Sequence, residues 1–209
     1  MNIAIPLSVF LISYIIGSFP TAYIVGKINH INIFEVGSGN MGANNIMRAL
    51  GLKWAVLVYL VDSGKGVLAI LIARLLGEAV SSSVIAAIAV VIGHNWSVLA
   101  TIITGKLRGG KGVATACGTW LMLAPYWQLF VVALSAWGAV VLLTRYVSLG
   151  ALVAVAIMVV WTFVLIFSAA IPAVYSVYVV LVSVMIYVRH WANIRALLTG
   201  RERRLGQRA

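Results

Sequence analysis

Long apolar runs dominate this chain, and short polar segments separate them. A helix needs about 20 apolar residues to cross a hydrocarbon core of about 30 Å. The runs that reach or approach this length are Ile3 to Val25, Trp54 to Leu76, Ser83 to Ile103, Trp127 to Leu143, Ala151 to Ala170 and Ala173 to Val188. A further segment, Val113 to Pro125, is short and opens with small residues, so it fits either a short span or a helix that enters and leaves on one side. The pattern predicts an all-α integral membrane protein.

The composition supports this class. Of 209 residues, 63% are hydrophobic and 9% are charged, which is more apolar surface than one soluble core can hide. The first run lacks a basic n-region and a small-residue cleavage site, so we expect a membrane helix rather than a signal peptide. Because the chain has no heptads, internal repeat or low-complexity tail, residues 1–209 are expected to form a single transmembrane domain.

The basic residues predict an orientation. With about seven spans, the polar loops alternate between two sides, and one side holds little more than Arg74 and Glu78. The other side receives Lys27, Arg48, Lys53, Lys106, Arg108, Lys111, Arg145, Arg189, Arg195, Arg201, Arg203, Arg204 and Arg208. The positive-inside rule makes this second side cytoplasmic, with the N-terminus outside and the C-terminus inside. The net charge of +11 therefore needs no nucleic acid partner, because topology and anionic lipid headgroups account for most of it.

Glycines and hydrogen-bond donors fill the first cytoplasmic loop, residues 35–51. Glycine permits positive φ, which lets successive backbone N–H groups converge on one anion. Side chains that suit a phosphate follow in the same segment: Ser38, Asn40, Asn44, Asn45 and Arg48. A helix that starts at about Asn44 would add its free N–H groups. The alternative is a flexible connector rich in turn formers.

A second loop, residues 106–115, again sets glycines against a lysine just before a helix. Gly109, Gly110 and Lys111 form no Walker A motif, because the spacing and the Lys-Ser/Thr ending are missing. A glycine turn, a lysine and a helix N-terminus nevertheless favour phosphate. A plain basic hairpin between helices remains open.

The last apolar run leads into a third polar segment, residues 189–202. His190 and Asn193 are spaced to share one helical face that could look back at the glycine loops. The alternative is an interfacial polar group. The cluster of Arg201, Arg203 and Arg204 is expected to be a topology and headgroup anchor.

Polar residues also occur inside the apolar runs. His94 and Asn95 are expected near the middle of a span, where they must face protein or a cavity. Asp62 and Lys65 are three positions apart and are expected to form a mainly structural pair.

Taken in order, these motifs resemble the bacterial acyl-phosphate:glycerol-3-phosphate acyltransferases, the PlsY family. The matching stretches are Gly37-Ser38-Gly39-Asn40-x-Gly42-Ala43-x-Asn45, Asp62-x-x-Lys65-Gly66, Gly93-His94, Gly109-Gly110-Lys111-Gly112-Val113-Ala114-Thr115, Ser148 and His190-x-x-Asn193-Ile194. The chain departs from the family pattern in its first motif, with Met41 where the family usually has proline and Asn44 where it has threonine.

The resemblance implies transfer of a fatty acyl group from acyl phosphate to the 1-hydroxyl of glycerol 3-phosphate, which gives lysophosphatidic acid and inorganic phosphate. It implies catalytic roles for Lys111, His190 and Asn193, and no cofactor. It implies a substrate-binding role for Ser38, Gly39, Asn40, Asn44, Arg48, Gly109, Gly110 and Ser148. Three scattered histidines and four acids make no metal-ligand cluster, so no metal is expected.

The same resemblance places the protein in a bacterial cytoplasmic membrane as a multi-pass monomer, with its active site on the cytoplasmic side and membrane lipid around it. A transporter of small phosphorylated metabolites would also need basic glycine loops, but the chain shows no repeat pairing. A phospholipid-binding scaffold would explain the basic tail but not both glycine loops.

Overall fold

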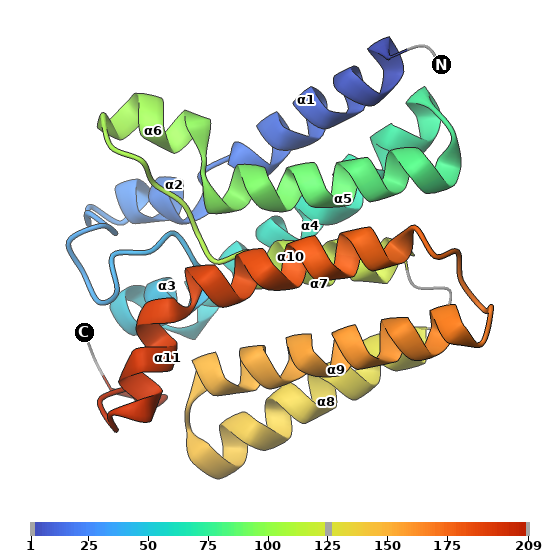
Figure 1. Cartoon of the computed structure of the whole chain (residues 1–209). Coiled ribbons are helices and arrows are strands. Elements are labelled where there is room, and N and C mark those ends of the chain that lie inside the picture. The colour runs from blue at the N-terminus through green and yellow to red at the C-terminus, as the bar shows by residue number, and fades with distance from the viewer. Residues whose placement is uncertain (1–2, 124–126, 208–209) are drawn as a thin grey trace.

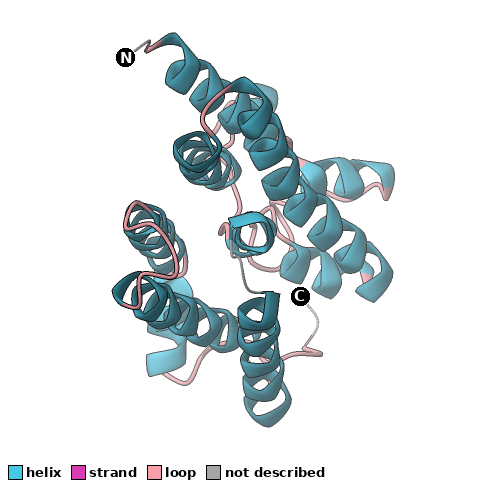
Figure 2. Cartoon of the chain, turned by 90° about the vertical axis from the view of Figure 1, so that its right-hand side faces the viewer, coloured by secondary structure: helices cyan, strands magenta, loops and turns pink. Residues whose placement is uncertain are grey.

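The computed structural model describes residues 3–123 and 127–207, and every regular element in these ranges is a helix. Figure 2 shows only helices and loops, and a single isolated bridge joins Ser97 to Arg108. The helices are α1 (Ala4–Ser18), α2 (Thr21–Ile28), α3 (Ala43–Leu50), α4 (Leu52–Leu76), α5 (Ala79–Asn95), α6 (Val98–Thr104), α7 (Val113–Leu123), α8 (Trp127–Thr144), α9 (Val147–Phe167), α10 (Tyr175–Arg189) and α11 (Trp191–Leu198). The predicted all-α class is confirmed for these residues.

Four helical segments in the described residues are long and apolar enough to cross a membrane, and their bounds are Ala4–Ile28, Leu52–Leu76, Trp127–Thr144 and Val147–Phe167. The bent pair α10 and α11, which meet at 59°, supplies a fifth if it counts as one span. The helices α5 and α7 are apolar but shorter. The expected segment Val113 to Pro125 forms the short helix α7, and its end at Pro125 lies outside the described residues. Arg208, in the predicted basic side, also lies outside them.

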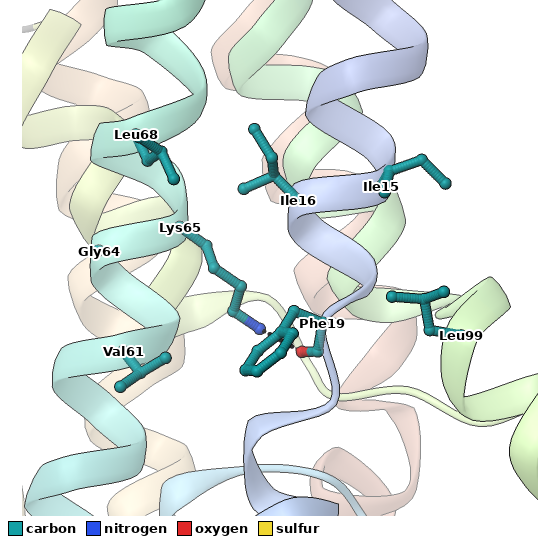
Figure 3. Close-up of a pocket in the computed structure, with 8 residues that line it drawn as sticks. All are labelled: Ile15, Ile16, Phe19, Val61, Gly64, Lys65, Leu68 and Leu99. Atoms are coloured by element: carbon teal, nitrogen blue, oxygen red, sulfur yellow. Dashed lines mark hydrogen bonds between the residues drawn. The ribbon is translucent and has the colours of Figure 1, made fainter.

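The first apolar run is broken at Phe19 and Pro20, between α1 and α2. Proline removes a backbone donor at this break. The carbonyl of Phe19 accepts from the Lys65 ammonium at 2.8 Å (Figure 3). Lys65 also pairs with Asp62 at 2.6 Å, which confirms the expected pair. Beside it lies an apolar groove of about 530 Å³, lined by Ile15, Ile16, Phe19, Val61, Gly64, Lys65, Leu68 and Leu99.

The expectation of one span from Ser83 to Ile103 is wrong. α5 ends at Asn95, and a separate helix, α6, begins after Ser97, whose side chain accepts from the N–H of Ala100 at 3.0 Å. Serine at this position favours a new helix start, because its oxygen replaces the missing partner of a first-turn N–H. His94 and Asn95 therefore lie at the end of α5 and not near the middle of a span.

Small residues let the helices pack closely around α5. A side chain at Gly17 of α1 would collide with the carbonyl of Val90, and one at Gly93 of α5 would collide with the carbonyl of Tyr14. The main apolar core, made by α1, α4, α5, α7 and α10 with α8 and α9, surrounds this contact. Close backbone approach is typical of helices that associate in lipid, where apolar burial gives little advantage.

The polar segments gather at one end of the bundle. Figure 1 shows α2, α3, α11, the α8–α9 turn and the loop between α6 and α7 at the same end, with the N-terminus at the other. A second apolar cluster, centred on Ile33, Ile46 and Val58, fixes the first loop and α3 on α4. The fold therefore brings together loops that are far apart in the sequence.

Candidate anion-binding site at the polar end of the bundle

The first glycine loop is shaped by Asn45, at the start of α3. Its side-chain oxygen accepts from the backbone N–H of Ser38 at 2.9 Å, and its amide donates to the carbonyls of Ile33 at 3.0 Å and Asn40 at 3.2 Å. Asn45 is 3% exposed, so its donors stabilise the loop instead of facing a ligand. Gly39 has φ of 64°, which confirms the expected positive φ in this loop.

The other predicted residues of this loop make few hydrogen bonds with the described residues. Asn40 donates to the carbonyl of Ser38 at 3.2 Å. The side-chain oxygen of Asn44 is buried and has no hydrogen-bond partner among the described residues. Met41 is buried, and its N–H donates to the carbonyl of Gly109 at 3.4 Å, a bond that a proline could not make. The Met41 departure thus adds a long hydrogen bond between the two loops.

The second glycine loop is held against the end of α5. The N–H of Gly110 donates to the carbonyl of His94 at 2.9 Å. The guanidinium of Arg189 donates to the carbonyls of Gly110 at 2.8 Å and Gly109 at 3.2 Å. A side chain at Gly109 would collide with the carbonyl of Asn95, and one at Gly110 with the His94 ring. Only glycine fits both positions, so the backbone itself forms this part of the site.

Lys111 continues that loop into a cluster of polar side chains. Its ammonium donates to the side-chain oxygen of Asn193 at 2.5 Å, and the Asn193 amide donates to Glu202 at 2.9 Å. The same Glu202 oxygen accepts from the Ser148 hydroxyl at 2.8 Å. Arg48 reaches this region from α3 and donates to the carbonyl of Arg203 at 3.3 Å. We call Arg48, Lys111, Ser148, Asn193 and Glu202 the polar cluster.

Burial and neighbouring cations make the cluster a place that favours an anion. The pKa of Lys111 is lowered to about 8, chiefly by burial; the charge of Glu202 opposes this shift, and the charges of Arg48 and Arg189 add to it. Burial also lowers the pKa of Arg48, again opposed by Glu202. One carboxylate among these cations leaves positive charge to be balanced, which a phosphate group can do.

His190 lies at the bend between α10 and α11 and is 4% exposed. Its Nδ1 is 2.9 Å from the carbonyl of Ile186, and because a carbonyl can only accept, Nδ1 carries the proton in this contact. In the neutral ring this leaves Nε2 as an acceptor. Asn193 lies three positions later, in the first turn of α11, so the two predicted residues are close to each other.

The structure joins some of the predicted site residues and leaves others apart. Ser148 and Asn193 both donate to Glu202, and Lys111 donates to Asn193. Arg48 donates to the carbonyl of Arg203 in the same tail. Within residues 3–123 and 127–207, no hydrogen bond links the side chains of Ser38, Asn40 or Asn44 to this cluster, so their predicted roles remain predictions.

Glu202 and Arg189 were missed by the sequence analysis. Glu202 is an acid within a basic tail, and that isolated charge was a signal of a specific partner. Arg189 was counted only as a topology residue, because nothing in the sequence shows that it contacts the glycine loop. Among the described residues, no group of His, Cys, Asp or Glu could hold a metal ion.

Fold and cluster together define an integral membrane protein with a candidate anion-binding site at one end of a helical bundle. Residues 7–200 match the family model described as glycerol-3-phosphate acyltransferase. Proteins named glycerol-3-phosphate acyltransferase from Rubrobacter xylanophilus and Thermus thermophilus are 42% and 40% identical to this chain, each alignment covering 95% of it and 94% of the relative.

Two solved structures are also similar. Both are crystal structures of PlsY (YgiH), an integral membrane glycerol 3-phosphate acyltransferase. The glycerol 3-phosphate form is 34% identical with a TM-score of 0.85, and the alignment covers 96% of each chain. The lysophosphatidic acid form is 33% identical with a TM-score of 0.80, covering 96% of this chain and 95% of the other.

The chain belongs to the glycerol-3-phosphate acyltransferase family. The resemblance inferred from the sequence motifs is therefore confirmed, and with it the class of enzyme, an acyltransferase.

Proposed function

We propose that this protein transfers a fatty acyl group from acyl phosphate to the 1-hydroxyl of sn-glycerol 3-phosphate, releasing lysophosphatidic acid and inorganic phosphate. The observation that carries the proposal is the polar cluster, in which Lys111 and Arg48 surround a single carboxylate at the polar end of the bundle. The names of the matched structures, in glycerol 3-phosphate and lysophosphatidic acid forms, support the acceptor and the product.

Each substrate carries a phosphate, and the site offers two kinds of anion contact. The glycine loop ends at Lys111, whose ammonium is a point charge, and Arg48 offers a guanidinium fork. Ser148 donates its one hydroxyl proton to Glu202 in this structure, so it would donate to a phosphate once that hydroxyl turns away from Glu202. Ser38, Gly39, Asn40 and Asn44 would complete the phosphate contacts from the first loop, as the family resemblance implies.

The chemical step needs little activation of the nucleophile, because acyl phosphate is a mixed anhydride. The acceptor hydroxyl oxygen bonds to the acyl carbon, and the bond from that carbon to the phosphate oxygen breaks. Lys111 stabilises the negative charge that develops on the leaving phosphate. The hydroxyl proton passes to Nε2 of His190 or to the leaving phosphate, and Asn193 orients the reacting groups.

The site is proposed to face the cytoplasm of a bacterium, where glycerol 3-phosphate is dissolved, while the acyl chain lies among the apolar helices. In this proposal the chain is one domain, residues 1–209, which acts as a monomer surrounded by membrane lipid. About seven spans with the N-terminus outside would place α3, the glycine loops and α11 on the inner face, as the distribution of basic residues predicts.

The test uses purified protein in detergent or lipid with palmitoyl phosphate and glycerol 3-phosphate. We expect equal amounts of inorganic phosphate and lysophosphatidic acid, and no product when palmitoyl-CoA replaces palmitoyl phosphate. Folded protein that forms neither product would contradict the proposal and favour the transporter. Product from palmitoyl-CoA alone would contradict the proposed donor.

The Lys111 pKa predicts a pH dependence. Because the pKa is about 8, the charged fraction of Lys111 falls from about 90% at pH 7 to about 10% at pH 9. The charged form binds phosphate, so we expect the KM for glycerol 3-phosphate to rise about tenfold over this interval. This KM is measured from initial rates at a fixed acyl phosphate concentration and varied glycerol 3-phosphate, corrected for spontaneous hydrolysis of the acyl phosphate. Arginine stays charged over this interval, so the Lys111→Arg variant should show little change of KM with pH. If KM in this variant still rises as in the wild type, a group other than Lys111 titrates.

The close contact at Gly109 predicts a binding defect. In Gly109→Ala the new methyl group collides with the carbonyl of Asn95, and the loop must shift. Overpacking of this kind costs about 1–3 kcal/mol of folding stability. The shift also displaces Lys111, two residues later in the loop, so we expect the KM for glycerol 3-phosphate to rise about tenfold. Gly138→Ala is the control, because a methyl group there meets no atom within 4 Å. Equal KM values in the two variants would show that the loop tolerates the shift.

A further inference from the structure

The C-terminal segment after α11, residues 199–207, is fastened to the turn between α8 and α9. We call it the C-terminal strap. The N–H of Leu205 donates to the carbonyl of Arg145 at 2.6 Å, and the Arg145 guanidinium donates to the carbonyl of Leu205 at 2.7 Å. Next to this clasp, the Arg204 guanidinium lies 5.6 Å from the centre of the Tyr146 ring. Both the backbone and the side chain of Arg145 therefore bond to Leu205 of the strap.

Arg145 holds this position in a backbone conformation that disfavours a side chain. Its φ is 64°, in the left-handed region, directly after the last residue of α8. Its own N–H donates to the carbonyl of Val141 at 2.8 Å, as at many helix ends, where glycine is the usual residue. Arg145 thus holds a backbone conformation that favours glycine, while its guanidinium makes a hydrogen bond to Leu205 that glycine could not make.

The clasp lies just beyond the residue that organises the polar cluster. Glu202 accepts from Ser148 and Asn193, and Arg203 accepts from Arg48 through its carbonyl. The strap is therefore held on one side by α11 and on the other by Arg145, with Glu202 between the two attachments. Most strap side chains are exposed, so few other contacts fix it.

We propose that Arg145 is a positioning residue: by fastening Leu205, it keeps Glu202 on Ser148 and Asn193 and so orients the side chains that meet the phosphates. This inference rests on the proposed function of the polar cluster. It makes the strap part of the enzyme's site, whereas the sequence analysis expected its arginines to serve only as a membrane anchor.

The test distinguishes the effect of the Arg145 guanidinium from the effect of the backbone turn at residue 145. Arg145→Gly removes the side chain but suits the left-handed backbone, so thermal stability should equal or exceed that of the wild type. We expect kcat/KM for glycerol 3-phosphate to fall about tenfold, the size of one lost hydrogen bond from a charged group. Arg145→Lys, which keeps the charge and one donor, should recover part of the loss. Arg201→Ala is the control, because it also removes one positive charge, and the Arg201 side chain makes no hydrogen bond or ion pair with the described residues.

A second measurement tests whether Arg145 acts through the strap. Deleting residues 205–209 removes Leu205 but keeps Arg203, whose carbonyl accepts from Arg48. We expect the same fall of about tenfold, with no further fall when Arg145→Gly is added, because coupled sites are not additive. Effects that multiply would overturn the proposal, as would equal kcat/KM in Arg145→Gly and Arg201→Ala.

Failure of the proposed function gives a different result. In that case the wild type forms no lysophosphatidic acid, whereas failure of the positioning role leaves wild-type activity intact and Arg145→Gly equal to it. Trypsin provides a readout without activity, since it cleaves after Arg203 and Arg204. Cleavage after Arg203 and Arg204 should be faster in Arg145→Gly than in the wild type, and equal rates would show that Arg145 does not fasten the strap.

Discussion

Replacing Lys111 by alanine is expected to lower kcat/KM about 10²- to 10³-fold, the usual cost of removing one group that stabilises developing charge. The Lys111 ammonium lies within 2.5 Å of the side-chain oxygen of Asn193, at the end of the glycine loop. Without it, the leaving phosphate loses a cation, and Asn193 loses the donor that fixes its oxygen. Steady-state kinetics with both products measured would give the loss.

The matched control is Lys106→Ala in the same loop. Lys106 is exposed, and its side chain makes no hydrogen bond or ion pair with the part of the chain that the structure describes. The kcat/KM of Lys106→Ala should therefore stay within about twofold of the wild type, as for most surface substitutions. If Lys111→Ala also remains near the wild type while its melting temperature is unchanged, Lys111 does not stabilise the leaving group. Lys111→Arg should retain more activity than Lys111→Ala at pH 7, because it keeps the charge.

Replacing His190 by asparagine is expected to lower kcat about 10²-fold or more with little change in KM, if Nε2 accepts the hydroxyl proton. The asparagine amide can take the place of Nδ1 and donate to the carbonyl of Ile186, so the helix bend is preserved. Only the Nε2 acceptor is removed. A loss in kcat alone identifies an interaction made in the transition state.

The converse variant completes this test. His190→Gln can place an acceptor near Nε2 but gives up the Nδ1 donor, so it should retain more kcat than His190→Asn and be less stable. If both variants turn over at nearly the wild-type rate, the substrate phosphate takes the proton and His190 has a structural role at the bend.

The sequence determined the class of this protein and most of its candidate site. Long apolar runs are typical of helices in a membrane, so they predicted this class of protein. The basic residues predicted which loops lie on the same side. Lys111, His190 and Asn193 came from motifs whose spacing is local. The pairing of Asp62 with Lys65 was also predictable, because neighbours on one helical turn must meet.

Tertiary structure decided what lies between these motifs. α5 ends at Asn95 because Ser97 starts a new helix and the glycine loop packs against His94, neither of which the apolar pattern records. Glu202 contacts Ser148, and Arg189 contacts the glycine loop, although each pair is far apart in the sequence. Periodicity carries no information about such contacts, because they depend on how the helices pack. The sequence thus determined which residues could bind an anion, and the packing of α3, α9 and α11 determined which of them meet.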